Sequence, residues 1–132
     1  MQKKRILVVE DEESLLKLET ILLTIKGFEV VGAFTGKMAI EKLAAEEFNL
    51  VLLDIMLPDI DGFEICRHIR QTPRTSKLPI LMLTAKKSQE DHDRGLLCGA
   101  NSYLHKPFKS AMIIDEINRL LNEAENGNCH GR

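Results

Sequence analysis

The sequence predicts an α/β protein in which helices cover both faces of a five-stranded parallel sheet. Strand and helix patterns alternate from one end of the chain to the other, five of each. The strand patterns include continuous apolar runs, such as residues 6–9 and 50–53, which are typical of strands buried on both faces of a sheet. Strict alternation favours parallel strands joined by right-handed crossovers. A length of 132 residues suits one domain with a substantial core.

The predicted strands are short runs rich in Val, Ile and Leu. They cover residues 5–9, 28–33, 49–54, 79–84 and 102–104. The first run closes on Glu10 and Asp11, and the third closes on Asp54. Pro79 stands at the edge of the fourth strand, where no backbone donor is needed.

The first predicted helix lies between the first two strands. Leu15, Leu18, Leu22 and Ile25 recur at helical spacing, and Gly27 ends the helix.

The other predicted helices begin at residues that favour a helix start. These starts are Thr35 or Gly36, Asp61, Ser88 and about Ser110. The fourth helix ends at Gly99, and the fifth spans 110–124. The side chains that we expect to face inward recur at helical spacing: Ala39, Ile40 and Leu43; Phe63, Cys66 and Ile69; Ile113, Ile117, Leu120 and Leu121.

Composition excludes several classes of protein. A net charge of -2 gives no reason to expect that this domain binds nucleic acid. No apolar run reaches membrane-spanning length, and the first one is too short for a signal peptide, so we expect a cytoplasmic protein. The three cysteines are odd in number and lack Cys-x-x-Cys spacing, which favours neither a disulfide framework nor a zinc site.

Three carboxylates are the strongest candidates for a site. Glu10, Asp11 and Asp54 follow directly on buried strands, and functional groups gather beyond the carboxyl ends of parallel strands. Crowded carboxylates repel unless a cation offsets their charge, and hard oxygen ligands suit Mg²⁺. Glu10 and Asp11 alone could merely complement a helix dipole. That explanation does not cover Asp54, so we predict a site for a divalent cation and a phosphoryl group.

Two further residues are candidates for contact with that phosphoryl group. Lys106 precedes Pro107, which restricts the backbone there; alone, it could equally be an exposed lysine in a turn. Thr84 ends the fourth predicted strand, and its hydroxyl could donate to a phosphoryl oxygen. Alone, a threonine there is explained by its preference for strands.

Four segments of the chain resemble the receiver domain of two-component response regulators. They are residues 6–12 (ILVVEDE), 52–62 (LLDIMLPDIDG), 83–85 (LTA) and 103–108 (YLHKPF). The resemblance extends from Lys4 to about Asn122, and the four motifs together are specific. It implies a doubly wound, flavodoxin-like sheet with strand order 2-1-3-4-5. It also implies residues 1–125 as the receiver domain and 126–132 as a polar tail.

The resemblance also implies roles for individual residues. Asp54 would accept a phosphoryl group from a sensor histidine kinase or a phosphotransfer protein. Mg²⁺, for which Mn²⁺ could substitute, would bind Asp11, Asp54 and the main-chain carbonyl of Met56 directly, and Glu10 through water. Lys106 would pair with phosphoryl oxygens. Thr84 and Tyr103 would act as switch residues, which would change the surface formed by the fourth helix, fifth strand and fifth helix. Such a domain is a switch that assists its own phosphorylation and dephosphorylation, not an enzyme in the usual sense.

Two rival functions use a similar fold. A phosphohydrolase with an aspartyl phosphate typically carries a second acid two residues after the nucleophile, and here that position is Met56. A flavodoxin-like nucleotide-binding module would need a Ser/Thr/Gly-rich loop after the first strand, where this chain has four consecutive acids. The sequence leaves open the cognate kinase, the stimulus, the phosphoryl lifetime, the output partner or domain, and whether a phosphorylation-dependent dimer forms.

Overall fold

The computed structural model describes residues 3–55, 57–84, 99–105 and 109–125 of the chain. Its strands are β1 (Arg5–Val9), β2 (Glu29–Ala33), β3 (Leu50–Asp54), β4 (Ile80–Thr84) and β5 (Ser102–His105). Its helices are α1 (Glu13–Ile25), α2 (Gly36–Ala45), α3 (Gly62–Gln71), the short 3-10 helix η1 (Pro73–Thr75) and α5 (Ser110–Glu125). The predicted fourth helix, from Ser88 to Gly99, falls almost entirely on residues 85–98, which lie outside the described part. No helix within the described residues is long and apolar enough to cross a membrane.

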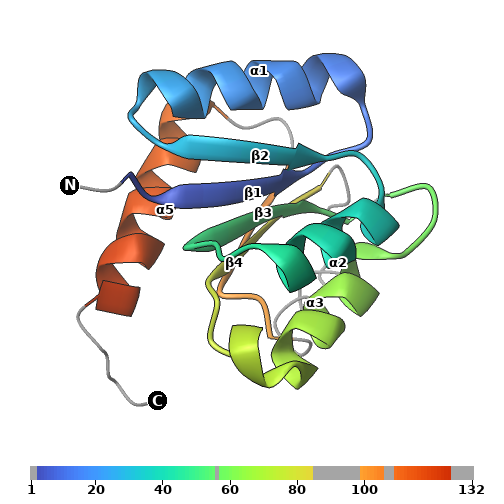
Figure 1. Cartoon of the computed structure of the whole chain (residues 1–132). Coiled ribbons are helices and arrows are strands. Elements are labelled where there is room, and N and C mark those ends of the chain that lie inside the picture. The colour runs from blue at the N-terminus through green and yellow to red at the C-terminus, as the bar shows by residue number, and fades with distance from the viewer. Residues whose placement is uncertain (1–2, 56, 85–98, 106–108, 126–132) are drawn as a thin grey trace.

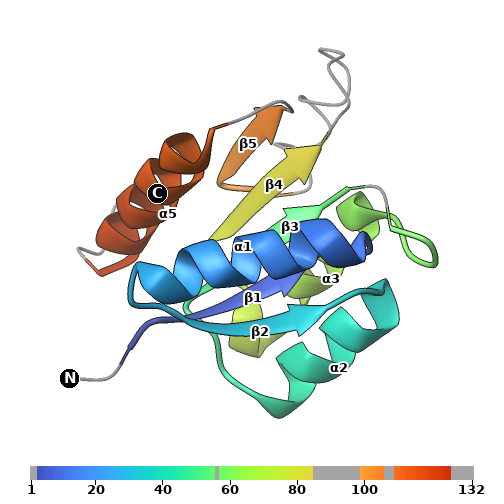
Figure 2. The same cartoon turned by 90° about the horizontal axis from the view of Figure 1, so that it is seen from above.

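The five strands form one parallel sheet in the order β2-β1-β3-β4-β5, as predicted. All five arrows point the same way in Figure 2, so the carboxyl ends of the strands meet at one edge. In the register of the sheet, Asp54 pairs with Leu83 and Thr84 pairs with His105. The order places β1 and β3, which precede the three predicted carboxylates, side by side in the middle of the sheet.

Helices cover both faces of the sheet (Figure 1). On one face, α1 and α5 pack against alternate residues of β1 and β3, including Ile6, Val8 and Leu52. On the other face, α2 and α3 pack against the intervening residues, including Leu7 and Leu53. All five residues of β3 are buried, as expected for a central strand covered on both sides.

The helix starts follow the predicted capping chemistry. The Thr35 side chain accepts a hydrogen bond from the backbone N–H of Met38 at the start of α2. The Asp61 carboxylate accepts from the N–H of Phe63 at the start of α3, at 2.7 Å. Each bond satisfies one of the donors left free at a helix amino end.

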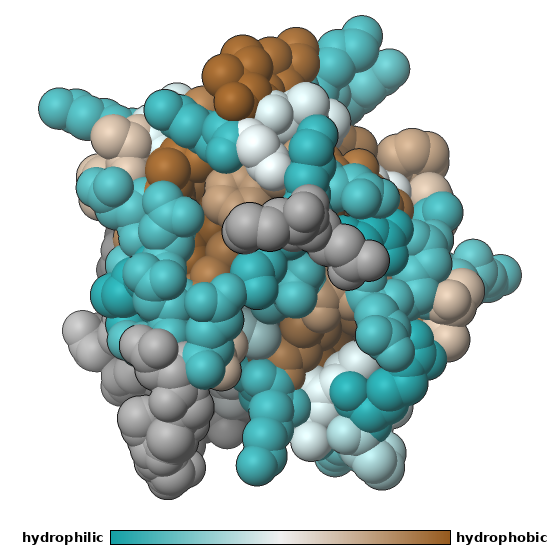
Figure 3. Space-filling model, turned by 60° about the vertical axis from the view of Figure 1, so that its left-hand side comes forward, coloured by the Kyte–Doolittle hydropathy of each residue, from teal (hydrophilic) through white to brown (hydrophobic). Residues whose placement is uncertain are grey.

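Some of the apolar residues whose spacing indicates the α1 helix do not face the core. Leu18 and Ile25 are 61% and 74% exposed, whereas Leu23 and Glu19 are buried. Figure 3 shows the resulting hydrophobic surface at the top of the molecule, where α1 lies in Figure 1. The spacing of Leu15, Leu18, Leu22 and Ile25 therefore identified the helix but not its inner face.

Candidate metal and phosphoryl site

The three predicted carboxylates meet at the carboxyl edge of the sheet. Asp54 is the last residue of β3, and Glu10 and Asp11 follow the end of β1. Glu10, Asp11 and Asp54 each offer an oxygen, and these oxygens lie within 4.8 Å of one another. Asp54 is far from Glu10 and Asp11 in the sequence, and the pairing of β1 with β3 brings the three residues together.

The carboxylates differ in their surroundings. Glu10 and Asp54 are buried, with 2% and 6% of their surface exposed, whereas Asp11 is exposed. Burial, followed by the charge of Asp54 and then that of Glu19, raises the pKa of Glu10 to about 8. The backbone N–H of Glu12 donates to Glu10 at 3.2 Å and opposes this shift. A buried acid whose pKa is strongly raised, lying beside a second buried carboxylate, fits a position where a cation would replace the proton.

Glu19 is a residue near the site that the sequence interpretation missed. It lies on the inner face of α1, with 3% of its surface exposed, and its charge adds to the field at Glu10. The available signal was its spacing from Leu16 and Leu23, which also face inward. An acid between two inward leucines is unusual, because buried carboxylates are costly.

The remaining predicted site residues are described only in part. Thr84 ends β4 at the same edge of the sheet, but its side chain lies outside the described part. Met56 and Lys106 also lie outside it. Tyr103 is buried within β5, in the cluster that includes Phe63 and Ile55.

The loop after Asp54 returns closely to the end of β3. The carbonyl oxygen of Ile55 accepts from the N–H of Leu57 at 3.2 Å and from that of Gly62 at 3.0 Å. The N–H of Ile55 donates to the carbonyl of Leu83, at 3.3 Å. The start of α3 is therefore held directly against the backbone of the site.

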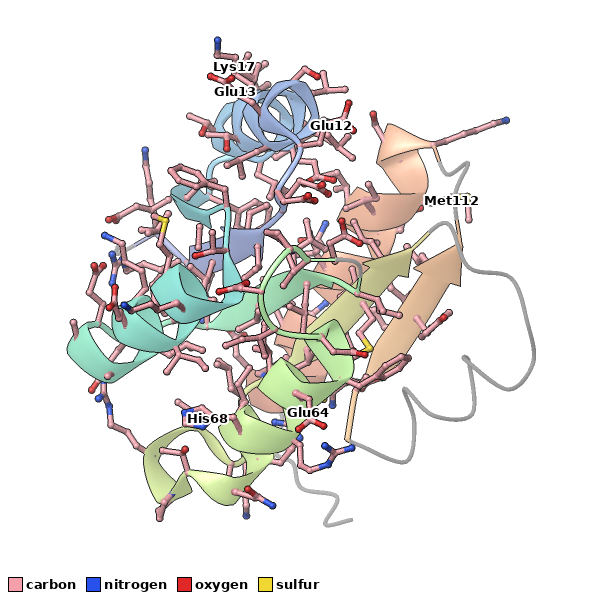
Figure 4. All side chains as sticks on the ribbon, turned by 90° about the vertical axis from the view of Figure 1, so that its right-hand side faces the viewer. Glu12, Glu13, Lys17, Glu64, His68 and Met112 are labelled. Atoms are coloured by element: carbon pink, nitrogen blue, oxygen red, sulfur yellow. The ribbon has the colours of Figure 1, made fainter. Side chains whose placement is uncertain are left out.

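An apolar groove of about 690 Å³ borders the carboxylates. Its walls include Asp11, Leu16, Lys17, Ile21, Phe34 and Pro58. Figure 4 shows Glu12, Glu13 and Lys17 grouped around the start of α1, so charges flank the groove. Asp11 belongs both to the wall of the groove and to the carboxylate cluster. A molecule seated in the groove would therefore lie next to the cluster.

A comparison with family models identifies the domain. The model for the response regulator receiver domain matches residues 6–118. The chain belongs to this family. Receiver domains are signalling switches of two-component systems, and they bind Mg²⁺ through an acidic pocket of the kind formed here by Glu10, Asp11 and Asp54. The rival assignment as a phosphohydrolase is not favoured.

Curated relatives and solved structures agree with this assignment. The receiver domain is 40% identical over 122 residues to the alkaline phosphatase synthesis transcriptional regulatory protein PhoP of Bacillus subtilis, covering 92% of this chain and 50% of the relative. It is 40% identical over 121 residues to the phosphate regulon transcriptional regulatory protein PhoB of Rhizobium meliloti, covering 92% and 53%. The chain thus spans about half the length of these relatives.

The fold matches solved receiver structures over nearly their whole length. A CheY-like receiver domain protein from Methanospirillum hungatei superposes with a TM-score of 0.89 at 32% identity, covering 94% of this chain and 98% of that one. The chemotaxis protein CheY4 of Vibrio cholerae gives 0.86 at 29% identity, covering 90% and 99%. The predicted fold class is confirmed by both.

The raised pKa of Glu10 predicts how stability depends on pH in the absence of metal. Between pH 4.5 and about 8 the folded chain holds a proton that the unfolded chain has released. The free energy of unfolding should therefore fall as pH rises through this range. Asp59 and Glu116 have lowered pKa values, so their contributions are lost at lower pH, outside this range.

Urea unfolding in the presence of a chelator, at several pH values in this range, measures the effect. Glu10→Gln should flatten the dependence, and excess Mg²⁺ should oppose it by binding the ionised carboxylates. A chain whose stability in chelator rises with pH over this range would contradict the assignment to Glu10.

Proposed function

We propose that this receiver domain accepts a phosphoryl group on Asp54 in a reaction that needs a divalent cation. The observation that carries the proposal is the meeting of Glu10, Asp11 and Asp54 within 4.8 Å at the carboxyl edge of the sheet. A carboxylate nucleophile gives an acyl phosphate. Catalysis of phosphoryl transfer rests mainly on positioning and on neutralising the transferred oxygens.

The proposed cation is Mg²⁺, with Mn²⁺ as a substitute. Asp11, Asp54 and the main-chain carbonyl of Met56 would bind it directly, and Glu10 would bind it through water. Mg²⁺ takes oxygen ligands and keeps several waters, which agrees with a site having one exposed and two buried carboxylates. The cation would draw charge from the phosphoryl oxygens, and Lys106 would pair with them from the protein side.

Thr84 and Tyr103 are the proposed switch residues. Phosphorylation adds about 1.5 to 2 negative charges, which gives the Thr84 hydroxyl a reason to move toward Asp54. Tyr103 lies on the edge strand β5, where it pairs with Met82 of β4, and its side chain is buried. The proposed output surface combines the predicted fourth helix, β5 and α5, and its two arrangements would differ in the position of Tyr103.

The proposed donor is a phosphohistidine on a sensor histidine kinase or a phosphotransfer protein. The apolar groove beside Asp11 offers such a protein a surface adjoining the acceptor. PhoP and PhoB bear the names of transcriptional regulatory proteins. For this chain, the output partner or domain, a phosphorylation-dependent dimer, the division into 1–125 and 126–132, and a cytoplasmic location remain predictions.

Labelling by a small phosphodonor tests the proposal. Incubation with acetyl phosphate and Mg²⁺ should add one phosphoryl group per chain, detected by intact mass. The same incubation in excess chelator should add none, because the charge on the transferred group is then not neutralised. Equal labelling with and without the cation would show that the carboxylate cluster is not a metal-dependent acceptor site.

A further inference from the structure

The loop between β3 and α3 is tied to a distant part of the chain by a single carboxylate. Asp59 Oδ1 accepts from the backbone N–H of Gly36 at 2.8 Å, and Oδ2 accepts from that of Lys37 at 3.0 Å. Oδ1 also accepts from the N–H of Ile60, at 2.9 Å. The first two donors belong to the amino end of α2, which is separated from Asp59 by more than twenty residues of sequence.

Packing supports the same contact. A Cβ at Gly36 would lie 2.7 Å from Cβ of Ile60, so the helix and the loop touch where only glycine fits. Ile60 and Leu57 pack against the core cluster below α2 and α3. The carboxylate stands at the positive end of the helix dipole, and its hydrogen bonds lower the pKa of Asp59. At neutral pH the Asp59 carboxylate is therefore ionised.

The Asp59 carboxylate acts on a loop that begins at the phosphoacceptor. The loop runs from Ile55, next to Asp54, to Gly62, and its two ends are joined by the hydrogen bond between Gly62 N–H and Ile55 C=O. Between these two ends, the Asp59 carboxylate fixes the loop to α2. This carboxylate therefore acts as a clamp on the loop. Groups that hydrogen-bond to metal ligands typically contribute a factor of 10 to 100 to metal affinity, and for a contact one step further away we take the lower end of this range.

We propose that Asp59 is a positioning residue for the cation site, because its carboxylate clamps the loop after Asp54 to the amino end of α2. The inference rests on the proposed function, since it concerns the same cation. It assigns to Asp59 a part in Mg²⁺ binding although its carboxylate is exposed and outside the carboxylate cluster.

Thr35 supplies a matched control. Its side chain caps the same end of α2, through the N–H of Met38, but the described bond does not involve the loop. Thr35→Ala and Asp59→Ala each remove capping from α2, so both should lower thermal stability. Only Asp59→Ala releases the loop.

Titration of the whole chain with Mg²⁺, followed by amide chemical shifts, decides between capping and positioning. Asp59→Ala should raise the Kd for Mg²⁺ roughly tenfold, whereas Thr35→Ala should leave it within about twofold of wild type. Asp59→Asn, which keeps one acceptor oxygen and serves if the alanine variant is poorly folded, should fall between them. A Kd for both Asp59 variants that matches Thr35→Ala would overturn the inference and leave the proposed function intact. Failure of wild type to bind Mg²⁺ would overturn the proposed function as well.

Discussion

Asp54→Asn is expected to remain unlabelled after incubation with acetyl phosphate and Mg²⁺, while wild type gains one phosphoryl group. The amide of asparagine is not a nucleophile for phosphoryl transfer, and it supplies only one neutral oxygen to a cation. Intact mass measurement separates the two proteins directly. Because Asp54 is 6% exposed and nearly isosteric with asparagine, the core around β3 should be preserved.

The matched control is Glu13→Gln, an acid-to-amide change at the exposed start of α1 (Figure 4). It should label like wild type. A second readout shows that the Asp54→Asn protein is folded: without metal it should unfold at a higher urea concentration than wild type at pH 8. Removing the charge of Asp54 relieves its repulsion with Glu10 and lowers the pKa of that buried acid. Equal labelling of Asp54→Asn and wild type would exclude Asp54 as the acceptor.

The sheet and the carboxylate cluster were predictable from the sequence for one physical reason. A parallel strand covered on both faces has no solvent side, so β1 and β3 appear as unbroken apolar runs. The acids that follow such runs must emerge at the carboxyl edge of the sheet. The order of the strands was not contained in these local patterns, and its prediction depended on the family resemblance.

The inner face of α1 could not be predicted from periodicity. Apolar residues occur almost all around this helix, with Leu16 and Leu23 on one side and Leu18 and Ile25 on the other. A hydrophobic stripe this wide leaves the rotation of the helix undetermined. The connections to β1 and β2, and packing against these strands, select the rotation that buries Glu19.

The Asp59 clamp was hidden for a different reason. Asp59 occurs in a loop rich in Pro and Asp, where an acid is explained by turn chemistry alone. Its partners, the N–H groups of Gly36 and Lys37, are backbone atoms and carry no signal in the sequence. Contacts between a side chain and a distant backbone appear only once the strands are placed.

Gly62→Ala is expected to destabilise the domain and to impair labelling at the same time. A Cβ at Gly62 would lie 2.6 Å from Cα of Ile55 and 2.8 Å from the carbonyl oxygen of Asp54. Both are backbone atoms, so relief requires α3 to withdraw or the end of β3 to shift. Overpacking of this kind costs about 1 to 3 kcal/mol. Part of this cost is offset, because alanine has a higher helix propensity than glycine, by about 1 kcal/mol in a helix interior.

Gly27→Ala separates the two effects. Gly27 lies between α1 and β2, at the opposite edge of the sheet, and no atom would lie within 4 Å of its added Cβ. Its φ of 97° is unfavourable for alanine, at a cost of about 1 to 2 kcal/mol. Both variants should therefore unfold at lower urea, but only Gly62→Ala should label more slowly with acetyl phosphate. If the two variants label equally well at matched stability, the contact between α3 and the backbone of Asp54 has no part in positioning the acceptor.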